Sequence, residues 1–172
     1  MKKLLLVIIV LGLCFCKKKK DDTLLTPEPT PVVPAYINSM TATVNGKTWL
    51  VLANQTSSAN IDQSVYNGNP KQYVIAGRTD LNLNKNSIHL GFAYTTGTVN
   101  LASFTTYYAH YFDSTGTSYP AKTGTMNIAL VDTAHKKSTA CDKFKATFSF
   151  VTSPVAGKSF TVTNGAIDFE AN

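Results

Sequence analysis

The chain has 172 residues, a length that suits one ordinary domain, and its 44% hydrophobic content is normal for a globular protein. Six of its 16 basic residues lie within the first 20 positions, so the net charge of +6 is concentrated at the N-terminus. From Tyr36 onward the chain has 10 Lys and Arg and 7 Asp and Glu, which gives a net charge of +3. The basic residues are scattered along the sequence, whereas nucleic-acid binding requires a concentrated basic surface. We therefore expect no nucleic-acid partner.

Residues 1–15 have the layout of an export signal peptide. Lys2 and Lys3 make a positive start, and an apolar run extends from Leu4 to Phe15. A helix over this run would reach only about 18 Å, against a hydrocarbon core of about 30 Å. We therefore expect residues 1–15 to direct export and to be removed, rather than to span a membrane.

A cysteine stands at the end of this apolar run. Leu13-Cys14-Phe15-Cys16 resembles a bacterial lipobox, in which a Leu lies three residues before the cysteine that receives lipid, and Leu11-Gly12-Leu13-Cys14 has the same spacing. We expect lipid on Cys16, because it adjoins the charged segment and leaves the whole apolar run in the leader. Cys14 is the alternative. The resemblance implies a membrane as partner, held through acyl chains that each contribute about 0.8 kcal/mol per buried CH₂.

Residues 16–35 follow as a charged run and a linker. Cys16 to Asp22 resembles the start of lipoproteins from the Bacteroidetes group, in which a pattern such as Lys20-Asp21-Asp22 is a signal for export to the cell surface. The resemblance implies an outer-membrane lipoprotein displayed at the surface, with the periplasmic face as the alternative. Prolines at 27, 29, 31 and 34 exclude a helix or a central strand and favour an extended spacer.

Residues 36–172 are predicted to form one all-β domain. Apolar and polar residues alternate with period two in Met40–Val44, Ile88–Tyr94, Met126–Leu130 and Phe144–Phe150, as in strands with one buried face. We expect about eight to ten strands in an antiparallel β-sandwich or a barrel-like fold, because no segment here has a helical period over three turns.

Two Asn-Gly dipeptides are predicted to be hairpin turns in this domain, since both residues tolerate the positive φ of a type I′ turn. Asn45-Gly46 would join the first strand to a second that contains Trp49, and we expect Trp49 in the core. Asn164-Gly165 would join a strand containing Phe160 and Val162 to one containing Ile167 and Phe169.

The domain also resembles an uncharacterised family of small Bacteroidetes lipoproteins that is defined only as a domain of unknown function. The resemblance covers roughly Met40 to Phe169 and rests on Thr43–Trp49, Tyr73–Gly77, Ala146–Phe150 and Val162–Gly165. It implies a β-rich, lipid-anchored domain and carries no known activity or site residues.

No catalytic, metal or cofactor site is predicted. Ser, His and Asp show no triad pattern, and His89, His110 and His135 lack a close metal-ligand spacing, so they are interpreted as surface histidines. Asp80–Asn86 departs from a calcium loop and is interpreted as a polar connection. Cys141 is expected to be a buried small hydrophobic residue.

The richest surface candidate is the segment Tyr107–Phe112. Alternation sends Tyr107 and Tyr111 to one face and Tyr108, His110 and Phe112 to the other. Because exposed aromatic rings stack on sugars or anchor partner proteins, we take the second set as candidate ligand contacts. The alternative is that both sets are buried, one in the core and one under a loop.

The leading functional hypothesis is therefore a lipid-anchored module that binds a glycan or a protein, or has a structural role in the envelope. Two alternatives stay open, an extracellular polymer hydrolase and a small envelope inhibitor. A hydrolase would need two carboxylates or a Ser–His pair that converge in a pocket.

Overall fold

The computed structural model describes residues 38–53, 60–66, 72–79, 85–102, 106–134 and 141–171, all of which belong to the compact unit Pro34–Asn172. The predicted signal peptide, both candidate lipidation sites Cys14 and Cys16, and the linker lie outside these residues. His135 and the part of the Asp80–Asn86 connection up to position 84 lie outside them too. Within the described residues, no helix has the length and apolar character to cross a membrane.

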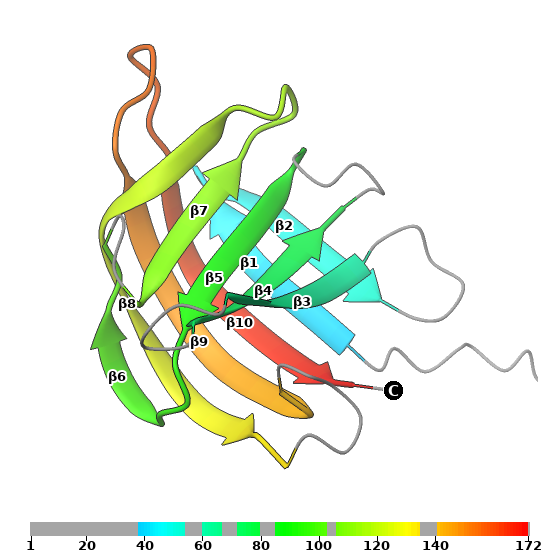
Figure 1. The fold of residues 1–172 in the computed structure, drawn as a ribbon. Helices are drawn as coiled ribbons and strands as arrows, with labels where there is room; N and C mark the ends of the chain where they lie inside the picture. Colours follow the sequence, from blue (N-terminus) through cyan, green and yellow to red (C-terminus); the bar gives the residue numbers. More distant parts are fainter. Residues whose placement is uncertain are drawn as a thin grey trace, which may run out of the picture. The chain divides into compact units, whose positions relative to one another are not determined.

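The described residues form ten strands in one antiparallel sheet: β1 (Asn38–Val44), β2 (Lys47–Ala53), β3 (Asn60–Tyr66), β4 (Gln72–Arg78), β5 (Ser87–Phe92), β6 (Gly97–Asn100), β7 (Tyr108–Phe112), β8 (Ser118–Asp132), β9 (Lys143–Thr152) and β10 (Thr161–Glu170). The strand order is β2-β1-β10-β9-β8-β7-β5-β4-β3, with β6 beside β8. The first and last strands of this order, β2 and β3, contact each other, so the sheet is nearly closed and barrel-like (Figure 1). The all-β prediction is confirmed, in its barrel-like form.

The long strand β8 carries the sheet from one side of the barrel to the other. Its first residues pair with β7, its later residues pair with β6 on the same edge, and β9 pairs along most of its length. The register to β9 shifts between Ala121 and Thr123 and again between Ile128 and Leu130. Such bulges bend a strand and increase its twist, which allows the sheet to close.

The barrel interior is filled by the apolar residues of the alternating segments. Met40, Phe92 and Phe144 are completely buried, and the polar neighbours in β1 and β9 face outward as predicted. Cys141 is buried in this core, as expected. Its backbone N–H and its thiol both donate to Oε1 of Gln63, at 3.0 and 3.4 Å. Burial raises the pKa of the Cys141 thiol to about 12, so the thiol stays protonated.

Trp49 lies in the core, which confirms the prediction. It reaches from β2 to β4, because a Cβ built on Gly77 would lie 3.0 Å from Trp49 Cη2. The indole Nε1 also donates to the backbone oxygen of Asn86 at 3.2 Å. Trp49 therefore links the two sides of the seam between β2 and β3 from inside the barrel.

The prediction of a hairpin turn at Asn164-Gly165 is wrong. β10 runs through both residues, and its register to β9 shifts there, with Asn164 at φ 51°. In a regular strand, residues an odd number of positions apart face opposite sides, yet Val162 and Ile167 both face the core. A β-bulge places both side chains on the same side just as a turn would. The chain reverses instead at Val155–Lys158, where Ala156 and Gly157 both have positive φ.

The other Asn-Gly prediction is confirmed, since Asn45 and Gly46 have φ of 46° and 78° between β1 and β2. Two alternations fail at their ends, because Tyr94, which follows the end of β5, is 38% exposed and Leu130 is 37% exposed. The bulge after Ile128 inserts Ala129 and turns Leu130 outward, opposite Lys145.

Candidate functional site

The three predicted contact residues lie together on the outer side of β7. Tyr108, His110 and Phe112 are half-buried, while Ala109 and Tyr111 between them are buried in the core. The prediction that this segment divides its aromatic residues between two faces is confirmed, and the outer set is partly accessible.

The register of the sheet adds His89 to this set. His89 on β5 pairs directly with His110, and its ring centroid lies 4.5 Å from that of Phe112. The His110 ring lies 5.3 Å from Tyr108 and 6.1 Å from Phe112. We call these four side chains the aromatic–imidazole face. They form a continuous group of rings across two strands, of the kind that stacks against ligands.

The Tyr108 ring lies over its cross-strand neighbour, Gly91 of β5. A Cβ built on Gly91 would lie 2.1 Å from Tyr108 Cε1, so only glycine leaves room for the ring in this position. The absence of a side chain at Gly91 thus sets the position of Tyr108 on the sheet surface.

Each histidine of the face is within hydrogen-bonding distance of a serine. His89 Nε2 lies 3.2 Å from Ser87 Oγ, and His110 Nδ1 lies 3.1 Å from Ser118 Oγ. Burial lowers the pKa of His110, so this ring is neutral at pH 7 and offers one donor and one acceptor. The face can therefore combine ring stacking with uncharged hydrogen bonds.

The Ser87–His89 pair does not resemble the nucleophile and base of a catalytic triad. Ser87 is completely buried, so its hydroxyl is not accessible as a nucleophile. Asp113, which follows β7, is engaged in its own turn: its carboxylate accepts from Thr115 and Thr117 N–H at 2.8 and 3.0 Å and from Tyr119 Oη at 3.1 Å. Burial alone would raise the pKa of Asp113, but these hydrogen bonds outweigh it and lower the pKa.

No group of three His, Cys, Asp or Glu side chains in the described part of the chain could hold a metal ion. His89 and His110 pair across β5 and β7, and each ring has one nitrogen directed at its own serine.

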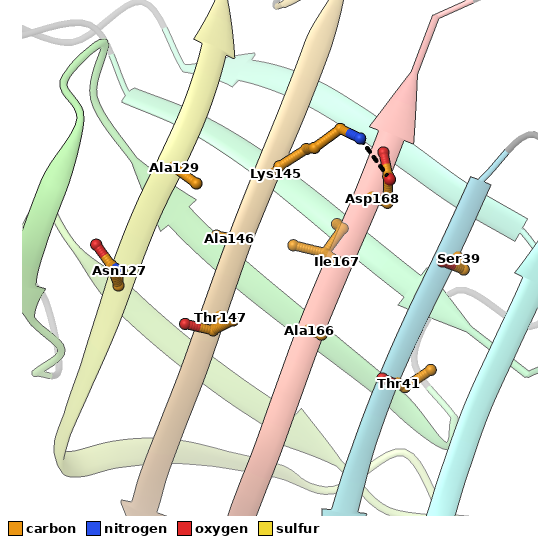
Figure 2. Close-up of a pocket in the computed structure, with 10 residues that line it drawn as sticks. All are labelled: Ser39, Thr41, Asn127, Ala129, Lys145, Ala146, Thr147, Ala166, Ile167 and Asp168. Carbon is orange, nitrogen blue, oxygen red and sulfur yellow. Dashed lines mark hydrogen bonds and ion pairs between the residues drawn. The ribbon is translucent and has the colours of Figure 1, made fainter.

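A second surface, which the sequence did not predict, lies on the outer face of β8, β9, β10 and β1 (Figure 2). Two adjoining hollows of about 300 and 550 Å³ share Asn127, Thr147 and Ala166. Lys145 and Asp168 meet at one end of the smaller hollow, with Nζ 2.7 Å from Oδ2. We call this surface, defined by Thr41, Asn127, Lys145, Thr147, Ala166 and Asp168, the polar trough.

One row of residues crosses the polar trough from strand to strand and continues beyond it on both sides. The strand registers align six residues in order, one from each strand: Leu50, Thr41, Ala166, Thr147, Asn127 and Thr98. Neighbouring strands lie about 4.8 Å apart, so the row is about 24 Å long measured along the curved sheet. The outward polar residues of each strand were visible in the sequence, but their alignment needed the registers of five strand pairs.

Comparisons with protein-family models, with curated proteins and with solved structures find no match for this chain.

Proposed function

We propose that this protein is an outer-membrane lipoprotein, anchored through Cys16 or alternatively Cys14, whose barrel-like domain binds a glycan or protein ligand at the cell surface. The resemblance to small Bacteroidetes lipoproteins belongs to the same proposal. The anchor rests on the signal-peptide layout and on the lipobox-like cysteine that follows it. The periplasmic face of the outer membrane is the alternative location.

The aromatic–imidazole face is the observation that supports a binding role. Tyr108, His110 and Phe112 are held outside the core with His89, at ring distances of 4.5 to 6.1 Å. A sheet could have presented small polar residues here, as it does in the polar trough. Rings of this kind are enriched at binding hot spots, because they give a large contact area at little cost in conformational entropy.

The binding role is tested with the full-length protein in detergent, applied to glycan arrays and to envelope proteins. For at least one ligand found, Tyr108→Ala and Phe112→Ala should each weaken binding by about tenfold or more, as truncation of a hot-spot residue does. Leu130→Ala, which removes an exposed apolar side chain elsewhere, is the matched control and should leave binding unchanged. Equal binding by all three variants would refute the assignment of this face.

The anchor is tested by mass spectrometry of the protein from cells. We expect a mature chain that begins at an acylated Cys16, and we expect Cys16→Ser to remain uncleaved and without lipid. Cleavage and acylation that persist in Cys16→Ser but disappear in Cys14→Ser would assign the anchor to Cys14. An intact Met1 with both thiols unmodified would refute the anchor altogether.

A further inference from the structure

The polar trough lies on different strands from the aromatic–imidazole face, and it has a different chemistry. Its hollows are lined by hydroxyl and amide side chains such as Thr41, Asn127 and Thr147, with Ala129 and Ala166 between them. Thr147, Asn127 and Ala166 are exposed on the outer sheet face. A ligand that fits this surface must therefore be recognised by hydrogen bonds and small methyl contacts rather than by ring stacking.

The charge of the trough restricts that ligand further. Lys145 and Asp168 are the charged residues of the two hollows, and their ion pair at 2.7 Å cancels both charges. An anionic polymer would meet no unpaired cation here, and a cationic one would meet no unpaired carboxylate. The charge balance of the trough favours an uncharged ligand.

The polar groups also fit a ligand that both donates and accepts. Threonine and serine hydroxyls and the asparagine amide each do both, which matches the hydroxyl groups of a sugar. Four residues of the row, Thr41, Thr147, Asn127 and Thr98, carry such side chains, with Ala166 between Thr41 and Thr147 and the apolar Leu50 at one end. Short and β-branched side chains lose little rotamer entropy when a ligand covers them.

We propose that the polar trough is a second binding site, which takes a segment of an uncharged polysaccharide lying across strands β1, β10, β9 and β8. The chain of sugars runs along the row through Thr41, Ala166 and Thr147, and its hydroxyl groups exchange hydrogen bonds with the threonine and asparagine side chains. Because no exposed ring contributes, each sugar is held weakly, and attachment depends on several consecutive sugars.

The experiment titrates the full-length protein, in a polyoxyethylene detergent that has no sugar headgroup, with cellohexaose, mannohexaose and chitohexaose. The anionic probe hexagalacturonate is compared at the same concentrations. We expect at least one neutral probe to bind with millimolar or better affinity and to shift the backbone amide NMR signals of Asn127, Thr147 and Ala166. Stronger binding of the anionic probe, or no binding by any neutral probe, would overturn the proposal.

Variants then locate the binding. Thr147→Arg fills the centre of the row and should weaken binding at least about tenfold, while Thr147→Val, which replaces the hydroxyl with a methyl group, should weaken it about 2- to 10-fold. Thr123→Arg is the matched control, since Thr123 is exposed on the same sheet but lines neither hollow. Tyr108→Ala should leave this binding unchanged, which separates the trough from the aromatic–imidazole face.

Two results would contradict this assignment directly. One is binding that Thr147→Arg leaves intact. The other is a change of the same amide signals with protein concentration alone, which would mean that a second copy of the chain occupies the trough.

Discussion

Gly77 and Trp49 offer a direct test of how the barrel closes. A Cβ built on Gly77 of β4 would lie 2.7 Å from Met40 Sδ and 3.0 Å from Trp49 Cη2. Overpacking of this kind costs about 1–3 kcal/mol, and the lower entropy of the unfolded Ala chain returns about 0.4–1 kcal/mol. We therefore expect Gly77→Ala to lower the free energy of unfolding by about 1–2 kcal/mol.

Trp49→Phe should cost about 2–3 kcal/mol, because it removes the hydrogen bond to the Asn86 oxygen and part of a buried ring. The smaller ring also vacates the space beside Gly77. In the Trp49→Phe background, Gly77→Ala should therefore cost about 1 kcal/mol less than it does alone. This coupling arises only if the side chain from β2 rests on β4 inside the barrel.

The assay is urea denaturation of the four proteins, followed by far-UV circular dichroism, since Trp49 is the only tryptophan and its fluorescence is lost in two of them. Gly91→Ala, on the outer face of the neighbouring strand, is the matched control and should be additive with Trp49→Phe. If the losses in the free energy of unfolding caused by Gly77→Ala and Trp49→Phe add to within about 0.5 kcal/mol in the double variant, closure of the barrel by Trp49 is refuted.

Four further predictions concern the turns, the core and the aromatic–imidazole face. Ala156→Asn should raise the free energy of unfolding by about 1 kcal/mol, because Ala156 has φ 50° in the β9–β10 turn and Asn tolerates this region better; an unchanged urea midpoint would contradict this. The free energy of unfolding should fall as the pH drops below about 6.5, because burial lowers the pKa of His110 in the folded state and the unfolded state then binds more protons. His110→Gln should make the free energy of unfolding less dependent on pH in this range, and an identical pH profile for the variant would contradict the prediction. Cys141 should resist alkylation by iodoacetamide at pH 8 until urea unfolds the protein, because its thiol is buried and its pKa is raised to about 12; rapid modification of the folded protein would be the opposite result. Gly91→Ala should displace the Tyr108 ring and weaken ligand binding at the aromatic–imidazole face to the extent that Tyr108→Ala does, whereas full binding would show that the ring position is not needed.

Much of the fold could be predicted, because its strands alternate regularly. Phe144, Ala146 and Phe148 are buried, and Lys145 and Thr147 between them face outward, as the period of two requires. The Asn45-Gly46 turn was predictable for the same reason, since the chemistry of two adjacent residues decides it.

Asn164-Gly165 shows where this local reasoning stops. The dipeptide and the change of parity between Val162 and Ile167 fit a turn and a bulge equally well. Pairing with β9 on one side and β1 on the other keeps the strand continuous, and a local pattern carries no information about either partner.

The candidate sites divide in the same way. Local alternation placed Tyr108, His110 and Phe112 on one face, and the structure agrees. The addition of His89 and the alignment of Thr41 with Ala166 and Thr147 depend on strands far apart in the sequence. Amino-acid order thus decides which side of its own strand a residue faces, because neighbouring residues alternate by steric necessity. Which residues then meet across strands is decided by long-range hydrogen-bond register, because that register forms only when the barrel closes around a shared core.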